Sequence, residues 1–213
     1  MTALRIEIVS DPVCPWCYIG KRRLDTALAG HPDVTVEIRW SPFQLTPDMP
    51  REGRDRAEHY AAIFGAERAA TIRESMVETA RQEGLEFQWR DGARSPNTLG
   101  AHVLVDLAAE TPGCDTSALV EALFHAHHVD CADLGDAAVL TRLGSDAGID
   151  AATLHKALAD HRREARVRAQ IQQAATRGIS GVPCFIFNDR YAVSGAQPAD
   201  AFADLIGRLV TNA

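Results

Sequence analysis

Patterns typical of β-strands occur near the two ends of this 213-residue chain, and the long middle section has the pattern of helices. Near the amino end, residues 5–9 are rich in β-branched and apolar types, and residues 34–40 alternate apolar with polar side chains. The residues between them suit a helix that runs from Val13 to a stop at Gly30. About the first 40 residues therefore predict a strand, a helix and a second strand, or βαβ.

The carboxyl end predicts two more strands and a closing helix. The segments VPCFIF and RYAVS flank Asn188 and Asp189, a pair that suits a two-residue hairpin turn. Gly195 breaks the second strand, and Pro198 stands where a first-turn proline would open a final helix. The two ends together predict the element order βαβ and ββα.

Between these ends, residues 51–174 have a helical pattern almost throughout. One apolar face begins at Leu99 and repeats at four-residue spacing, with an expected helix start near Ser95. A connection of this length is too long for a structureless loop, and its apolar faces need a core of their own. We therefore predict an α/β fold in which residues 1–50 and 175–213 form one domain, and the middle section forms a large inserted all-helical domain.

The turn from the first strand into the first helix carries two cysteines, in the segment SDPVCPWCYIGKRRL. A CxxC at the start of a helix in a βαβ unit is typical of redox sites. Unpaired backbone N–H groups and the positive end of the helix dipole favour a thiolate at Cys14, so we predict that it is the nucleophile. Cys17 lies one turn further along the same face and is the predicted resolving thiol. Trp16, between them, either contacts substrate or anchors in the core.

Other interpretations of these cysteines are less well supported by the sequence. A zinc site needs two further ligands at compatible spacing, and Cys114 and Cys131 supply neither a second CxxC nor a CxxH knuckle. Two inert buried thiols would not explain a pair at a helix start. His127 and Cys131 are spaced for one helix face, but two ligands do not make a metal site, so no metal is predicted.

The composition restricts the partners and the compartment. A formal net charge of −7 disfavours nucleic acid and anionic lipid as partners, because affinity for phosphates rests on clustered Lys and Arg. No apolar run approaches the roughly 20 residues needed to cross a bilayer. The first residues have the pattern of a strand and lack a signal peptide, so we expect a cytoplasmic protein. Because a reducing cytosol keeps thiols free, a pair that oxidises there is expected to be catalytic.

Three segments together resemble a known family. The element order, with SDPVCPWCYIGKRRL, SPNTLGAHVL and GISGVPCFIFNDRYAVSGAQP, is similar to the DsbA-type thioredoxin superfamily, and specifically to its cytoplasmic FrnE-like branch. The similarity extends from Leu4 to Leu209. It implies a thioredoxin fold interrupted by a helical insertion, related to 2-hydroxychromene-2-carboxylate isomerase and to the kappa-class glutathione transferases.

The resemblance also implies roles for single residues. By position, Cys14 and Cys17 match the redox pair, and Pro183 matches a cis-proline that faces them. Val182 would then offer its backbone groups to an extended substrate strand.

Three further residues have two interpretations each. Asn97 and His102 lie in a segment whose counterpart is near the active cleft in glutathione-binding relatives, which makes them candidate substrate contacts; helix capping and ordinary packing are the alternatives. Cys184 departs from the family pattern, in which an apolar residue commonly follows the proline. We expect alternation along the strand to turn Cys184 away from the face that carries Val182, and we predict that it is a packing residue rather than a third redox thiol.

These observations predict a thiol–disulfide oxidoreductase that acts on protein or low-molecular-weight disulfides and thiols. It needs no metal and no bound organic cofactor, and glutathione is a candidate redox partner or co-substrate. The first alternative is a glutathione-dependent isomerase or transferase of the kappa type, a group that usually has Ser at the first motif position and lacks the second cysteine. The second is a non-catalytic metal- or stress-binding protein. No oligomeric state is predicted.

Overall fold

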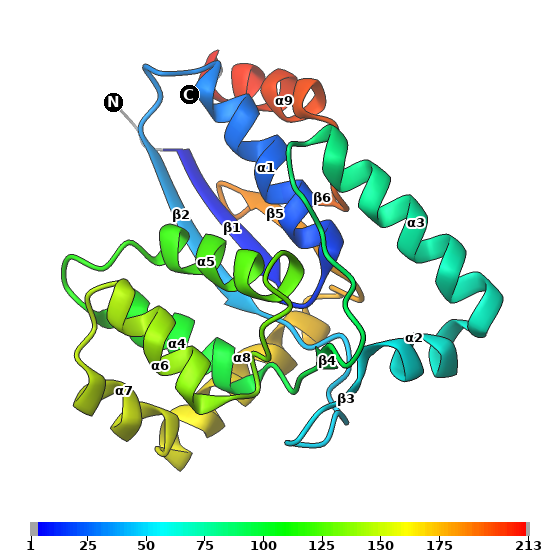
Figure 1. Ribbon diagram of the computed structural model, residues 1–213. Coiled ribbons are helices and arrows are strands. Elements are labelled where there is room, and N and C mark those ends of the chain that lie inside the picture. Colours follow the sequence, from blue (N-terminus) through cyan, green and yellow to red (C-terminus); the bar gives the residue numbers. More distant parts are fainter. Residues whose placement is uncertain (1–3, 212–213) are drawn as a thin grey trace.

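The computed structural model describes residues 4–211, and these form a central four-stranded sheet covered by helices (Figure 1). The strands of the sheet lie in the order β2–β1–β5–β6. β1 runs parallel to β2 and antiparallel to β5, which in turn is antiparallel to β6. The helix α1 connects β1 to β2, and α9 follows β6, which confirms the predicted α/β architecture. The bounds of these elements are β1 (Leu4–Ser10), α1 (Pro15–Ala29), β2 (Val36–Pro42), β5 (Cys184–Phe187), β6 (Tyr191–Ser194) and α9 (Ala199–Thr211).

The segment between β2 and β5 is helical apart from one pair of very short strands. Its elements are β3 (Arg54–Asp55), α2 (Arg56–Phe64), α3 (Ala66–Gln82), β4 (Arg94–Ser95), α4 (Leu99–Glu110), α5 (Thr116–His128), α6 (Ala137–Asp146), α7 (Ala151–Leu158) and α8 (His161–Thr176). The β3–β4 pair departs from the expected all-helical insertion, because strands of two residues are too short to produce an alternating pattern. Residue 174, the predicted end of the insertion, lies inside α8. The division into two domains stays a prediction.

Side chains of the loops decide where some of these helices begin. The Asp150 carboxylate accepts the backbone N–H of Thr153 at 3.0 Å and caps α7. The expected start of α4 near Ser95 is wrong by four residues, because Ser95 belongs to β4. The side chain of Asn97 accepts the N–H of Leu99 at 3.0 Å, so the first turn of α4 forms only after it.

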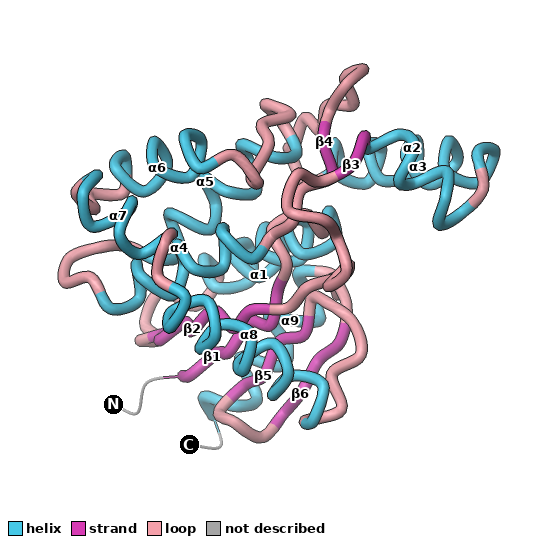
Figure 2. The backbone as a smooth tube through the Cα atoms, turned by 90° about the horizontal axis from the view of Figure 1, so that it is seen from below, coloured by secondary structure: helices cyan, strands magenta, loops and turns pink. Residues whose placement is uncertain are grey.

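The helices bury both faces of the sheet. Alternation along β1 sends Ile8 into a cluster with Leu24 of α1 and Phe202 of α9 on one face, and Val9 onto Ala174 of α8 on the other. Figure 2 shows that α4–α7 gather on one side of the molecule and α2–α3 on the other. Within residues 4–211, no helix is both long and apolar enough to cross a bilayer.

Candidate active site

The turn between β1 and α1 places Cys14 at the amino end of the helix. Cys14 is the N-cap residue, and the first helical position is Pro15, which loses only an N–H that has no helical partner. The Cys14 N–H donates to the Asp11 carbonyl at 2.9 Å, and the Cys14 carbonyl accepts the N–H of Cys17 at 3.0 Å. The Cys14 side chain makes no capping bond, so its sulfur is available for reaction at the helix start.

The two thiols are free and almost fully buried. Cys14 is 3% exposed and Cys17 is 2% exposed. Burial, together with the neighbouring Cys14, raises the pKa of the Cys17 thiol well above its ordinary value. Cys17 is therefore held as a thiol, which is the state expected of a group that waits for a mixed disulfide to form beside it.

The loop before β5 closes over the first cysteine, as the resemblance implies. The Val182–Pro183 peptide bond is cis, and the Cys14 thiol donates to the Val182 carbonyl at 3.7 Å. A β-carbon on Gly20 of α1 would stand 3.2 Å from the Pro183 side chain and 3.1 Å from the Phe185 ring. The absence of a side chain at Gly20 thus lets the proline loop lie against the helix.

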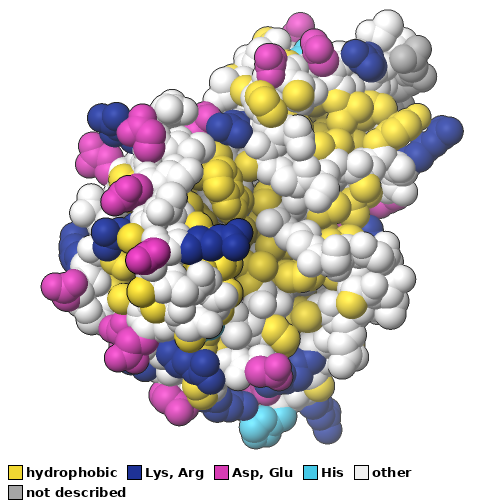
Figure 3. Space-filling model, turned by 90° about the vertical axis from the view of Figure 1, so that its right-hand side faces the viewer, with side chains coloured by type: hydrophobic (Ala, Val, Ile, Leu, Met, Phe, Trp, Pro, Cys, Tyr) yellow, Lys and Arg dark blue, Asp and Glu magenta, His cyan; other side chains and the backbone are white. Residues whose placement is uncertain are grey.

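A cavity of about 230 Å³ lies beside Cys14, lined by the loop after β2, by α2 and by the β1–α1 turn. Leu45 and Phe64 are exposed apolar side chains on its wall. Tyr60, also on the wall, has its pKa raised to about 12, mainly by burial and further by the neighbouring Cys14. Trp16 is 39% exposed, which fits a substrate contact better than a core anchor. Figure 3 shows apolar side chains gathered in a hollowed strip on one face of the molecule.

Asp11 contributes a carboxyl group to the same cavity, and sequence reasoning missed it. Its oxygens accept the N–H of Leu45 at 2.8 Å and the N–H of Val13 at 3.5 Å. Full burial raises the pKa of Asp11 to about 7, although these hydrogen bonds lower it. The signal in the sequence was an acidic residue between the strand and the CxxC, in SDPVC.

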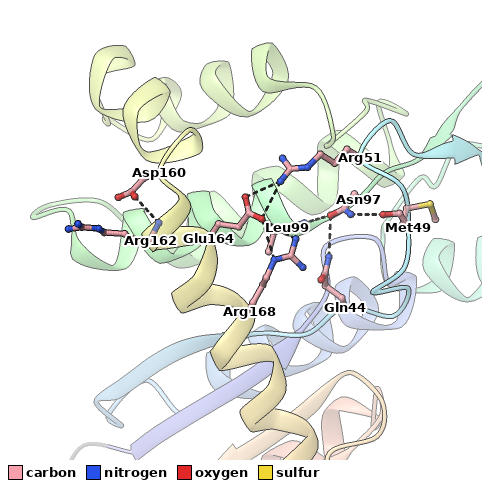
Figure 4. A network of polar contacts seen from close by, with 9 residues as sticks. All are labelled: Gln44, Met49, Arg51, Asn97, Leu99, Asp160, Arg162, Glu164 and Arg168. Atoms are coloured by element: carbon pink, nitrogen blue, oxygen red, sulfur yellow. Dashed lines mark hydrogen bonds and ion pairs between the residues drawn. The ribbon is translucent and has the colours of Figure 1, made fainter.

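Asn97 and His102 lie behind the loop that lines this cavity (Figure 4 shows Asn97). The Asn97 amide donates to the Met49 carbonyl at 2.6 Å, and its oxygen accepts from Gln44 at 3.3 Å. His102 Nε2 donates to the Phe43 carbonyl at 2.8 Å, and burial lowers the pKa of this imidazole to about 4. Both residues hold the loop in place, and their contact with substrate stays a prediction.

The remaining candidates occupy other surroundings. Cys184 is buried beside Val9 of β1 and Ala174 of α8, in a cluster of apolar side chains. Val182 packs against the same cluster, so the expected orientation of Cys184 away from Val182 is wrong, because residues two apart in an extended segment point to the same side. His127 Nδ1 lies 3.2 Å from the guanidinium of Arg56, and the Cys131 thiol donates to the Gln88 carbonyl at 3.5 Å. Across residues 4–211, no three potential metal-binding side chains come together.

The arrangement suits two-electron exchange between a dithiol and a disulfide. One sulfur stands at a helix start beside a cavity, and the second is one turn away and held protonated. When Cys14 forms a mixed disulfide, Cys17 is within one helical turn of it and can form the Cys14–Cys17 bond that releases the substrate thiol.

Comparisons with known proteins place the chain in a family. The model of the DSBA-like thioredoxin domain matches residues 5–207, so the protein belongs to that family and the predicted superfamily is confirmed. A probable DsbA oxidoreductase from Streptomyces coelicolor is 33% identical, with a TM-score of 0.85 over 96% of this chain and 89% of that one.

Two further solved structures share the fold at lower identity. The cytosolic disulfide reductase DsbM from Pseudomonas aeruginosa is 18% identical, with a TM-score of 0.71 over 98% of this chain and 100% of that one. A 2-hydroxychromene-2-carboxylate isomerase is 14% identical, with a TM-score of 0.75 over 98% of this chain and 97% of that one. At identities this low, the similarity shows only that these two proteins share the fold of this chain.

Proposed function

We propose that this protein is a thiol–disulfide oxidoreductase in which Cys14 attacks and Cys17 resolves. The proposal rests on one observation, the different environments of two neighbouring thiols. Cys14 is the N-cap of a helix and its sulfur makes no capping hydrogen bond, whereas burial holds Cys17 as a thiol. The family membership supports the same chemistry.

The reaction needs only the two thiols and a substrate disulfide. The Cys14 thiolate attacks one substrate sulfur, forms a mixed disulfide and expels the other substrate sulfur as a thiolate. Cys17 then attacks Cys14, loses its proton and forms the intramolecular disulfide, while the second substrate sulfur leaves with the electron pair. The substrate is reduced by two electrons and the CxxC is oxidised by two; the reverse sequence oxidises a substrate dithiol.

The proposed substrates are protein or low-molecular-weight disulfides and thiols. Val182 and Pro183 stand beside Cys14, where an extended substrate could pair with the Val182 backbone. Glutathione is a proposed redox partner or co-substrate, and no bound cofactor or metal is required; the reductase DsbM has also been solved with GSH. By analogy with that cytosolic reductase, the proposed location is the cytoplasm.

Trapping of the intermediate tests this proposal. Cys17→Ser keeps the attacking thiol and removes the resolving one, so it should accumulate mixed disulfides that are visible on acid-quenched, non-reducing gels. The matched variant Cys14→Ser should trap none. Equal amounts of adduct in both variants, or none in either, would contradict the roles assigned to the two cysteines.

A glutathione-dependent isomerase or transferase of the kappa type is the second candidate, because a 2-hydroxychromene-2-carboxylate isomerase shares the fold. In that mechanism the glutathione thiol performs the chemistry, so Cys17→Ser should have little effect on turnover and Cys14→Ser should stay partly active. Assays of insulin reduction and of glutathione-dependent isomerisation on the same two variants separate the candidates.

A further inference from the structure

A second cavity, of about 260 Å³, lies on the other side of the cysteine pair, between the sheet and the helices α4, α5 and α8. Its inner wall includes Val120 and Phe124 of α5 and Trp40 of β2. These side chains also belong to, or pack against, the apolar cluster that contains both cysteines. The cavity therefore shares part of its wall with the apolar cluster that holds the cysteine pair.

The hydroxyl of Ser10 joins the cavity to Cys17. Ser10 is 6% exposed and lines the cavity. Its oxygen forms no hydrogen bond of acceptable geometry with any residue in the described part of the chain. It nevertheless lies close enough to the Cys17 thiol to favour the thiolate, against the effect of burial. Burial of a hydroxyl without a hydrogen-bond partner is unfavourable, so a water molecule in the cavity is its expected partner.

The cavity is suited to hold water and to connect it with solvent. Its volume far exceeds the roughly 10–15 Å³ that one water needs. Polar side chains on its walls include His102 and Gln173, which supply hydrogen-bonding groups along its length. At its outer end, Arg39 and Ala109 are exposed to solvent.

Resolution of the mixed disulfide requires that Cys17 lose a proton, and its burial obstructs that loss. Asp11 lies in the cavity on the Cys14 side, where its oxygens accept backbone N–H groups. The Nε2 of His102 is occupied by the Phe43 carbonyl. Within residues 4–211, Ser10 is thus the side chain beside Cys17 whose hydroxyl has no hydrogen-bond partner.

We propose that Ser10 relays the proton of Cys17 to water in the cavity behind it during the resolving step. The inference rests on the proposed function. As the Cys14–Cys17 bond forms and the Cys14–substrate bond breaks, the Cys17 proton passes to the Ser10 oxygen. The Ser10 hydroxyl proton passes at the same time to a cavity water, and the substrate sulfur leaves with the electron pair as a thiolate. Charge and atoms balance, and no further reactant is needed.

In a protein that carries Cys114→Ser, Cys131→Ser and Cys184→Val, so that Cys14 and Cys17 are its remaining thiols, the two can be followed separately with the aromatic disulfide dithiobis(nitrobenzoic acid). Attack by Cys14 on this probe releases one coloured thiolate, and attack by Cys17 on the resulting mixed disulfide releases the second. For Ser10→Ala we expect an unchanged first phase and a second phase slowed by about a hundredfold at neutral pH, the lower end of the range for general acid–base effects. The difference should disappear at high pH, where hydroxide removes the thiol proton directly.

Three variants complete the experiment. Ser10→Thr keeps the hydroxyl and should restore the second phase. Ser41→Ala makes the same chemical change elsewhere on the cavity wall, where the hydroxyl donates to Glu7, and should leave both phases unchanged. Ala109→Phe should slow the second phase by obstructing the outer end while leaving Ser10 and Cys17 in place.

The outcomes distinguish the relay from the proposed function. If the parent protein releases only one coloured thiolate per molecule, Cys17 does not resolve the mixed disulfide, so the disulfide exchange itself is wrong and the relay falls with it. If the parent shows two phases and neither Ser10→Ala nor Ala109→Phe slows the second, the relay alone is overturned. A slowing that persists unchanged at high pH also overturns it, because it would indicate altered packing at Cys17.

Discussion

Asp11 shows how one side chain can couple the stability of the fold to the active site. Its carboxyl group ties the loop after β2 to the turn that carries Cys14, through the N–H groups of Leu45 and Val13. This position is fully buried, and burial raises its pKa to about 7. The charged form therefore costs free energy in the folded protein at and above neutral pH.

The pH dependence of stability follows from that shift. The unfolded chain releases the Asp11 proton near the ordinary pKa of 3.8, whereas the folded protein retains it up to about pH 7. Between these values the unfolded state binds fewer protons, so the contribution of Asp11 falls as pH rises. Asp11→Asn should gain stability relative to the parent by about 1.4 kcal/mol per pH unit across this window. Denaturant unfolding at a series of pH values measures it; a constant difference between the two proteins would contradict the assigned pKa.

Cys184 provides a test of which thiols take part in exchange. It is buried with Val9 and Ala174, so Cys184→Val should keep most insulin-reduction activity. A substitution of similar volume in a core costs less than about 1.5 kcal/mol in the free energy of unfolding. The same substitution at Cys17 should abolish turnover. Loss of activity in a folded Cys184→Val protein would make Cys184 a redox participant.

At the scale of single residues, the sequence predicted the groups that belong to a recognisable motif. Cys14 and Cys17 could be predicted because their spacing and their place at a helix start have a chemical meaning. Asp11 and Ser10 could not, because their roles depend on burial and on neighbours that are distant along the chain, such as Leu45.

The packing of the helices depends on close approach at one glycine. Gly144 of α6 faces α7 and α4, and a β-carbon there would stand 2.5 Å from a methyl group of Leu154 and 3.0 Å from one of Leu104. Both leucines belong to the apolar cluster of α4–α7, whose side chains have little room to move. Glycine at this position of α6 thus lowers the helix propensity but allows α6 to pack closer to its neighbours.

Two alanine substitutions separate these effects. Gly144→Ala should destabilise the protein, because overpacking costs typically about 1–3 kcal/mol and exceeds the gain of roughly 1 kcal/mol in helix propensity. Gly207→Ala in α9 meets nothing closer than His31 at 3.7 Å, so only the propensity gain applies and the protein should become more stable. Thermal unfolding of both variants measures the contrast, and equal shifts in the same direction would contradict this packing analysis.

The helices and strands could be predicted where the apolar periodicity or a helix-capping residue was clear in the sequence. The cap at Asp150 and the βαβ and ββα order follow from local patterns. The start of α4 could not be predicted from a local pattern. Ser95 is held in the β3–β4 pair by its partner Arg54, which is distant along the chain.

Across the whole molecule, a charged cluster joins α1 to α5. Glu121 of α5 accepts the hydroxyl proton of Tyr18 in a hydrogen bond of 2.8 Å. It also forms ion pairs of 2.8 Å with Lys21 and with Arg22. Although burial raises the pKa of Glu121, these partners hold it below its ordinary value. The helix that carries the cysteines is thereby fixed to the helical segment behind it.

Glu121→Gln should weaken that connection. It leaves Lys21 and Arg22 without their shared carboxylate, and we expect a loss of about 1–3 kcal/mol, less than for a fully buried pair because Glu121 is partly exposed. A carboxylate with a lowered pKa stabilises above its unfolded pKa, so the difference from the parent should shrink as pH falls below the ordinary pKa of 4.5 and vanish below the lowered pKa of the folded protein. Asp146→Asn removes one side of an exposed ion pair with Arg142 and should change stability by less than about 0.5 kcal/mol. Similar losses in both variants would contradict the importance of the cluster.

The contact between Cys14 and Val182 joins positions 168 residues apart in the chain. During synthesis, the segment with the cysteines leaves the ribosome well before the segment that covers it. At about 5–20 residues per second the delay is roughly 10–30 seconds. Through that interval the nascent chain presents its nucleophilic cysteine without the proline loop, β5 or α9. The newly made protein is therefore most open to oxidation or to adduct formation by cellular disulfides before residues 182–211 have been added.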